Sequence, residues 1–222
     1  MAIPVDETLA IFAAVEQGDS DTVRRMVRHR ADIVDAQRPG DGLSLVLYAM
    51  YLGHWEMVDL IAPIHPGLDI FESAALGRDK RIRHLTTTNP LLLKKRSPDG
   101  WTALHLAAYF GQIDAARVLL DQGADPNAVS ENDLRATPLH SAAAGRHFAV
   151  CDLLIGAGAD LDAQQDGGFT ALMAAAQHGD RGLAELFIKR GASRAITAAD
   201  GRTAADIAEA AGHGELAAFL RP

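Results

Sequence analysis

The sequence of 222 residues has no run of 18 consecutive apolar residues, a single cysteine, and few aromatic side chains (5%). Without such a run we expect no transmembrane helix. Acidic residues near the N-terminus, with no basic segment before them, argue against a secretory signal. A lone cysteine excludes an internal disulfide and is typical of a reducing compartment. We therefore expect a cytoplasmic protein that does not enter a membrane.

Basic residues are also fewer than acidic residues. Lys and Arg number 21 against 29 Asp and Glu, and residues 101–222 hold 9 basic against 15 acidic side chains. An acidic surface repels phosphate backbones, so nucleic acid is not an expected partner. Two basic runs, 24–30 and 77–83, interleave cationic and apolar residues at helical spacing. We interpret both as solvated outer faces, with contact to an acidic partner as the alternative.

The motifs of common catalytic and ligand-binding sites are missing as well. No nucleophile elbow, phosphate loop or dinucleotide fingerprint is present, and the histidines do not recur at metal-binding spacing. Acidic residues in the predicted turns fit no calcium loop. Cys151 falls at an apolar position of a predicted helix, where a small buried hydrophobe is expected rather than a nucleophile. The sequence thus predicts no catalytic residue, no metal site, no cofactor and no enzymatic activity.

What the sequence has in abundance is a repeated phrase. "DGWTALHLAAYFG" (99–111) returns as "RATPLHSAAAGR", "GFTALMAAAQHG" and "GRTAADIAEAAG", and the threonines of these phrases are 35, 33 and 33 residues apart. A period near 33 with T-P-L-H-x-A-A at its head resembles the ankyrin repeat. The resemblance implies an all-α solenoid of about seven helix-turn-helix repeats joined by short β-hairpin loops, forming one domain over residues 1–222. The repeats are placed at about 7–38, 39–66, 67–96, 97–131, 132–164, 165–197 and 198–222.

Local features of the repeat have physical roles. The head threonines are expected to cap the first helix, and Gly111 and Gly179 to end it in a left-handed turn. Arg146 stands where this glycine belongs and follows Gly145, so we expect that turn to shift by one residue. For His105 and His140, the fourth residues of their heads, the resemblance implies a bridge between adjacent hairpins.

In proteins of this family the hairpin tips and the exposed sides of the first helices form a groove that commonly binds partner proteins. Large apolar side chains project to this groove although the scaffold does not need them, and such patches mark binding sites. The predicted partner-binding residues are Tyr51, Leu52, Leu76, Trp101, Tyr109, Phe110, Phe169 and His178, with Leu43 beside them. The predicted function is a monomeric, non-catalytic scaffold that binds a protein of unknown identity.

Three alternatives stay open at this point. The N-terminal repeats could fold over the groove and bury its aromatic side chains. The groove could instead hold an apolar small molecule, as a ligand or a substrate, with His178 or Asp99 as nearby polar groups. The protein could also be a stabilising or inhibitory subunit of an enzyme. An enclosed pocket would favour the small molecule, and an open groove would favour a protein.

Overall fold

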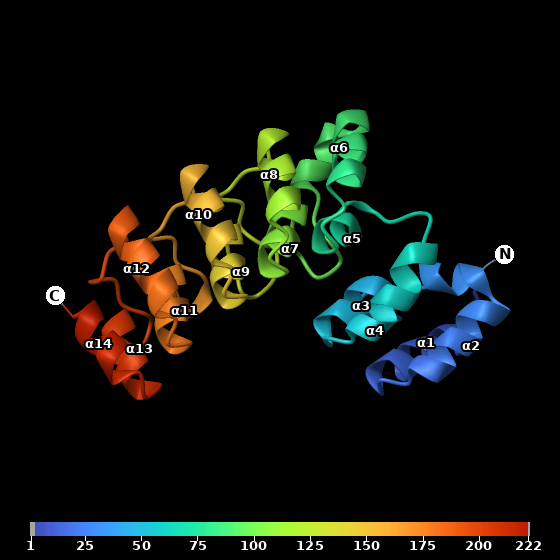
Figure 1. Cartoon of the computed structure of the whole chain (residues 1–222), viewed down its shortest axis with the longest axis horizontal. Helices are drawn as coiled ribbons and strands as arrows, with labels where there is room; N and C mark the ends of the chain where they lie inside the picture. Colours follow the sequence, from blue (N-terminus) through green and yellow to red (C-terminus); the bar gives the residue numbers. More distant parts are fainter. Residues whose placement is uncertain (1–2, 222) are drawn as a thin grey trace. The chain divides into compact units, whose positions relative to one another are not determined.

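A computed structural model describes residues 3–221 of the chain. The described residues form fourteen α-helices and four short 3-10 helices, with no β-strand (Figure 1). The all-α fold class is therefore confirmed. The ends of the predicted domain, residues 1, 2 and 222, lie outside the described residues. The expected hairpins carry only the isolated bridges Gln37–Ser44 and Thr197–Thr203.

The helices follow one another in pairs, each pair being one repeat. In chain order they are α1 (Val5–Glu16) and α2 (Ser20–His29), α3 (Leu45–Tyr51) and α4 (Trp55–Ile61), α5 (Ile70–Ala75) and α6 (Asp79–Thr88), α7 (Ala103–Tyr109) and α8 (Ile113–Asp121), α9 (Pro138–Ala144) and α10 (Phe148–Gly156), α11 (Ala171–Gln177) and α12 (Arg181–Arg190), α13 (Ala204–Ala210) and α14 (Gly214–Leu220). The 3-10 helices η1 (Ala31–Asp35), η2 (Ala62–Ile64), η3 (Pro90–Lys94) and η4 (Asp166–Gly168) lie in the connections.

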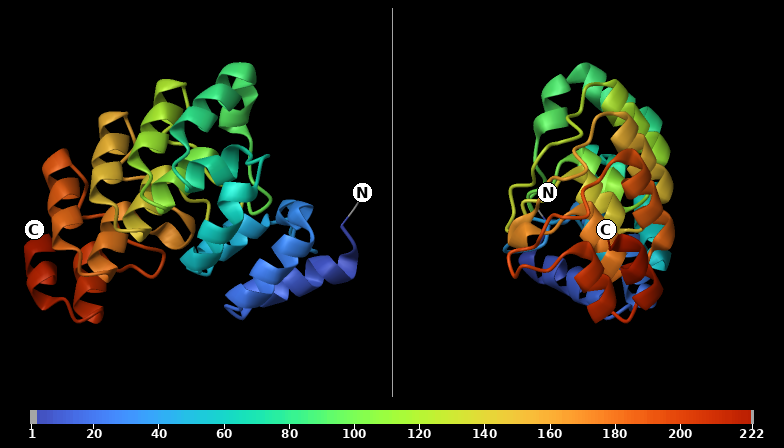
Figure 2. Two further views of the ribbon diagram at one scale, coloured as in Figure 1. Left: turned by 45° about the vertical axis from the view of Figure 1, so that its right-hand side comes forward. Right: turned by 90° about the vertical axis from the view of Figure 1, so that its left-hand side faces the viewer.

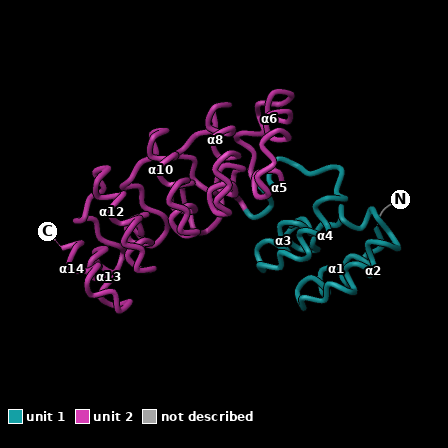
Figure 3. The backbone as a smooth tube through the Cα atoms, in the orientation of Figure 1, with its two compact units in different colours: residues 1–72, 97–99 teal, residues 73–96, 100–222 magenta. Residues whose placement is uncertain are grey.

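The chain divides into two compact units (Figure 3). The first unit comprises residues up to 72 together with 97–99, and the second comprises residues 73–96 and those from 100 onward. That the whole chain forms a single domain stays a prediction. In the first unit α1 packs on α3 and α2 packs on α4.

In the second unit the helices lie in two rows. The first helices α7, α9, α11 and α13 pack in sequence against one another, and the second helices α6, α8, α10 and α12 do the same. The hairpin connections run along one edge of these rows (Figure 2). Small side chains permit the close helix packing, since Ala107 and Ala108 are fully buried beside Leu104. No repeat covers its own apolar face, so each depends on its neighbours.

Three of the head threonines cap the first helices as expected. The Thr102 hydroxyl accepts a hydrogen bond from the His105 N–H, and Thr170 and Thr203 cap α11 and α13 in the same way. Gly111 ends the α7 turn with φ +71°, and a Cβ there would lie 2.5 Å from Nδ1 of His147. This glycine is therefore required both for its left-handed backbone and for the space it leaves.

The predicted one-residue shift of the turn after α9 is wrong. Arg146 itself adopts the left-handed conformation, with φ +59°, and the turn keeps the register of the other repeats. Gly145 has an ordinary φ of −76°. A Cβ on Gly145 would lie 2.5 Å from the carbonyl oxygen of Tyr109 and from Cδ2 of His147. The glycine thus serves close approach to the preceding repeat, and the arginine takes the strained position.

Candidate protein-binding surface

An aromatic pair stands at the end of α7. Tyr109 is the last residue of this helix and is 44% exposed, and the Phe110 ring meets it edge to face with centroids 5.1 Å apart. The next repeat holds the backbone beneath the pair, because Nε2–H of His147 donates to the carbonyl oxygen of Tyr109 at 2.9 Å. The pair is presented to solvent from a backbone fixed by two repeats.

Two further aromatic residues each precede a capping threonine. The half-buried Trp101 ring lies 5.3 Å from the His105 ring, and Phe169 is also half-buried. The carbonyl oxygen of Phe169 accepts a hydrogen bond of 3.0 Å from Nε2–H of His140. His105 donates likewise to Ala136 at 2.9 Å, so both histidines bridge to the following hairpin as predicted.

The bridging histidines are neutral structural groups. Burial lowers the pKa of His105 to about 4, and it also lowers the pKa of His140. Because a carbonyl can only accept, Nε2 of each ring carries the proton, and Nδ1 of His105 faces the Thr102 hydroxyl at 2.6 Å. Cys151 is fully buried, and burial raises the pKa of its thiol to about 12. Such a thiol stays protonated and is a poor nucleophile.

The other predicted groove residues are distributed over both units. In the second unit Leu76 is half-buried and His178 is exposed at the end of α11. Tyr51 and Leu52 belong to the first unit, where they are 36% and 40% exposed. The Tyr51 hydroxyl donates to Asp99 at 2.8 Å.

The prediction that Leu43 lies in the groove is wrong. Its side chain is only 5% exposed and belongs to the core of the first unit. Its carbonyl oxygen accepts a hydrogen bond from the N–H of Arg38 across a short hairpin, and this pairing holds the residue inward.

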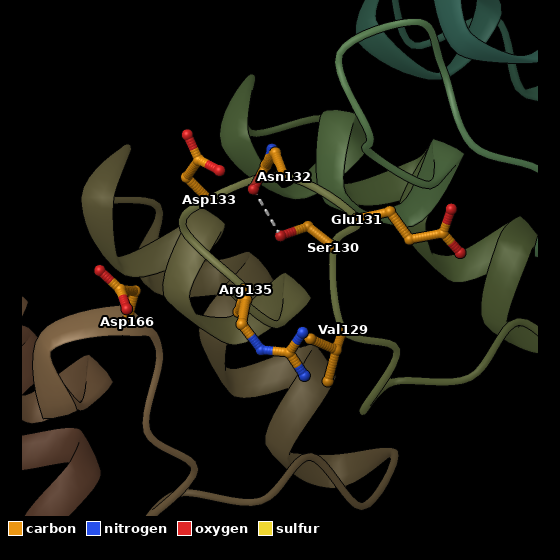
Figure 4. Close-up of a pocket in the computed structure, with 7 residues that line it drawn as sticks. All are labelled: Val129, Ser130, Glu131, Asn132, Asp133, Arg135 and Asp166. Carbon is orange, nitrogen blue, oxygen red and sulfur yellow. Dashed lines mark hydrogen bonds between the residues drawn. The ribbon is translucent and has the colours of Figure 1, made fainter.

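Two of the hollows on the second unit are lined in part by hairpin residues. One of about 240 Å³ is lined by residues of the last two repeats: Phe169, Gln177, Arg202, Ile207, Ala210 and Ala211. Phe169 and Arg202 each precede a head threonine, and Gln177, Ala210 and Ala211 lie at the ends of first helices. The other hollow, of about 680 Å³, lies at the hairpin tips (Figure 4). Its lining residues are Val129, Ser130, Glu131, Asn132, Asp133, Arg135 and Asp166.

Sequence reasoning missed the hollow at the hairpin tips. The signal available in the sequence was the length of the hairpin before Thr137, since Gly123 and Thr137 are 14 residues apart whereas Gly158 and Thr170 are 12 apart. The extra residues place Arg135, with φ +48°, at the position that Gly168 and Gly201 occupy in later hairpins. The insertion therefore changes the surface of one hairpin and leaves the helix packing intact.

A buried carboxyl group in the first unit was also missed. Glu72 is 3% exposed, and burial raises its pKa. Its Oε2 accepts the N–H of Asp69, whose carboxylate in turn accepts the N–H of Phe71 and of Glu72, so the two residues cap the start of α5. Nε2 of His65 lies 3.5 Å from its other oxygen. The Glu72 carboxyl group lies where the connection from α4 meets α5, and it caps α5. Its role is therefore structural.

The remaining features concern metals, membranes and the basic runs. Within residues 3–221, no three His, Cys, Asp or Glu side chains are placed to hold a metal ion. None of the helices in that part of the chain combines the length and the apolar character that crossing a membrane requires. Residues 24–30 lie mainly on α2 and 77–83 mainly on α6, with Arg28, Lys80 and Arg83 exposed, as a solvated face requires.

A comparison with family profiles now identifies the repeat. The profile described as "Ankyrin repeats (3 copies)" matches residues 71–165 and 139–222, which together cover more than half of the chain. The chain belongs to the ankyrin-repeat family. Its histidine bridges are the feature that the sequence resemblance implied.

Three relatives share sequence similarity with the repeats. The ankyrin-repeat chain is 34% identical over 152 residues to the "Transient receptor potential cation channel subfamily A member 1 homolog" of Caenorhabditis elegans, a match covering 68% of this chain and 12% of that protein. It is 36% identical over 126 residues to mouse "Ankyrin repeat and SAM domain-containing protein 6" (55% and 14%). It is 38% identical over 124 residues to "Neurogenic locus notch homolog protein 1" of Xenopus laevis (54% and 5%).

The matched segment thus spans only a small part of each of these relatives. What the similarity supports is the role of the repeats themselves, which is protein–protein interaction. The whole-protein activities of the relatives do not follow from it.

Proposed function

We propose that this ankyrin-repeat protein is a cytoplasmic, monomeric, non-catalytic scaffold that binds a partner protein. The binding surface of the second unit is formed by Leu76, Trp101, Tyr109, Phe110, Phe169 and His178. Tyr51 and Leu52 are the corresponding residues of the first unit. No cofactor is required for this function.

The observation that carries the proposal is the Tyr109–Phe110 pair, in which Tyr109 is exposed and Phe110 is half-buried. An aromatic side chain 44% exposed leaves apolar area in contact with water, and the first-helix packing does not use it. Aromatic residues on a preformed backbone are favoured anchors for a protein partner, because little conformational entropy is lost when they bind. The His147 hydrogen bond to Tyr109 supplies such a backbone.

The chemistry of the surface argues against catalysis. The histidines that recur in the repeat heads are buried, neutral and engaged with carbonyl groups, and the only cysteine has a raised pKa. The hollow at the hairpin tips is open and lined largely by charged and polar side chains, unlike the enclosed apolar pockets that hold small molecules.

Native mass spectrometry of the protein isolated gently from its own host would test the proposal, with two matched variants. Tyr109→Ser removes the exposed anchor on α7, whereas Phe148→Ser removes an aromatic residue that is 51% exposed on α10, a second helix. A stoichiometric protein partner is expected with the wild type and with Phe148→Ser, and is expected to be lost with Tyr109→Ser. Equal retention by both variants, or a bound small molecule in place of a protein, would overturn the proposal.

A further inference from the structure

The hollow at the hairpin tips is bordered by a hairpin with several internal hydrogen bonds. Within the longer hairpin, the Ser130 hydroxyl donates to Asn132 at 2.8 Å and accepts the N–H of Ala136 at 2.9 Å. The N–H of Asp166 in the next hairpin donates to the carbonyl oxygen of Leu134 at 2.8 Å. These bonds hold the hollow open without a ligand, so a ligand would not have to order it.

Apolar side chains stand exposed on this hairpin. Val129 is 40% exposed and lines the hollow, and Leu134, which is 50% exposed, lies between two of its lining residues. Neither side chain belongs to the buried core of the second unit. Core packing therefore does not account for an apolar residue at either position.

Acidic groups outnumber basic groups around these apolar side chains, although Arg135 lines the hollow and the Arg96 guanidinium donates to the carbonyl oxygen of Val129. The two hairpins, residues 124–136 and 159–169, hold six acidic side chains and one arginine. Within residues 3–221, the carboxylates of Asp133 and Asp166 accept no hydrogen bond and pair with no cation, and Figure 4 shows both directed away from the guanidinium of Arg135. Glu131 faces the guanidinium of Arg96 at 3.8 Å. Unpaired carboxylates beside apolar groups complement a cationic and apolar ligand.

We propose that this hairpin-tip surface, formed by Val129, Glu131, Asp133, Leu134 and Asp166, binds a basic segment of the partner protein in which Lys or Arg alternates with apolar residues. The apolar side chains of the segment contact Val129 and Leu134, and its cations pair with Asp133 and Asp166. The inference rests on the proposed function and adds to it the chemistry of the partner.

Backbone hydrogen bonds connect the hairpin-tip surface to the residues around the aromatic side chains Trp101 and Phe169. The N–H of Glu131 donates to the carbonyl oxygen of Gly100, the residue before Trp101, at 2.9 Å. Asp166 lies three residues before Phe169 in the next hairpin, and the N–H of Gln165 donates to the carbonyl oxygen of Phe169 at 2.9 Å. A segment seated on the acidic tips is thus directed toward the aromatic groove.

Selection from a displayed library of random 12-residue peptides on the immobilised protein tests this proposal. The selected peptides are expected to be rich in Lys or Arg together with apolar residues. A synthetic peptide of the selected consensus is then titrated by fluorescence polarisation against the wild type and two variants. Asp133→Asn with Asp166→Asn should weaken binding by about threefold to tenfold, because exposed ion pairs contribute modestly.

The matched control is Asp114→Asn with Asp121→Asn, which removes the same charge from exposed positions on α8. Binding to this control is expected to equal that of the wild type. Raising the salt concentration should weaken binding to the wild type more than binding to the Asp133→Asn, Asp166→Asn variant.

The outcomes separate this inference from the proposed function. Selected peptides that are neutral or acidic, or that lose equal affinity in both double variants, overturn the basic-segment proposal and leave a protein-binding scaffold in place. If no peptide is selected by the wild type, and native mass spectrometry finds no protein partner, the proposed function falls and this inference falls with it.

Discussion

Replacing His105 by Met changes how the stability of the protein depends on pH. The same position of a later repeat is occupied by Met173, which is 1% exposed, so a buried methionine fits this site in the fold. The substitution removes the hydrogen bond from Nε2–H to the carbonyl oxygen of Ala136 and the contact of Nδ1 with the Thr102 hydroxyl. That hydroxyl still accepts the backbone N–H of position 105, as Thr170 accepts the N–H of Met173. Because that oxygen keeps a second donor, the N–H of Ser130 at 2.8 Å, the loss at neutral pH is expected to be about 1 kcal/mol.

Protonation acts in the opposite direction. Burial lowers the pKa of His105 from 6.5 to about 4, so the unfolded chain binds this proton more readily than the folded chain between these two values. The stability that His105 contributes is therefore fully present above pH 6.5 and is lost as the pH falls toward 4. Between pH 7 and pH 5 this loss amounts to about 2 kcal/mol.

The His105→Met variant has no titratable side chain at this position, so its stability does not fall in this way between pH 7 and pH 5. Wild type is thus expected to be the more stable form at pH 7 and the less stable at pH 5, with the two curves crossing between about pH 5 and 6. Urea unfolding followed by circular dichroism across this range measures both curves.

His84→Met, at an exposed position on α6, is the control and should leave the pH dependence unchanged. A stability difference between wild type and His105→Met that stays constant, or that widens in favour of the wild type on acidification, would refute the assignment of His105 as a buried neutral base.

Three further predictions concern the scaffold. Gly111→Ala should lower the thermal unfolding temperature of the protein by more than Gly123→Ala. Both glycines have positive φ, but an added Cβ meets the His147 ring only at Gly111. Equal losses of stability in the two variants would contradict this explanation. Arg146→Gly should stabilise it by about 1 kcal/mol because the left-handed turn costs an L residue about that much, offset slightly by the lost surface ion pair with Asp180; a lower melting temperature would show that the turn is unstrained. Cys151 should resist iodoacetamide at pH 8 in the folded protein and react in urea, since burial raises its thiol pKa to about 12; rapid labelling of the folded protein would rule out the buried site.

The sequence was sufficient to predict the helix pairs, the capping threonines and the histidine bridges, because each depends on residues within one repeat or on the next repeat at a fixed spacing. The turn at Arg146 was not predictable in this way. Its register depends on Gly145 leaving room for Tyr109 and His147, and this contact is visible only when two repeats are stacked.

The candidate surface shows the same limit. The repeat pattern placed Tyr109 and Phe169 at solvent-facing positions, but it also placed Leu43 there, and a short hairpin turns that residue inward. The acidic hollow at Asp133 and Asp166 joins two hairpins that are more than thirty residues apart in the sequence. Its only trace in the sequence was a hairpin two residues longer than its neighbours, a feature that indicates a changed surface without indicating its chemistry.

Photo-crosslinking tests the central claim, that a protein docks on the aromatic pair at the end of α7, most directly. Benzoylphenylalanine placed at position 109 projects from the proposed surface, and the same group at the exposed position 121 on α8 serves as the matched control. After irradiation in an extract of the native host, the account predicts a discrete protein adduct from position 109 and none from position 121. An adduct from position 121 alone, or none from position 109, would contradict it.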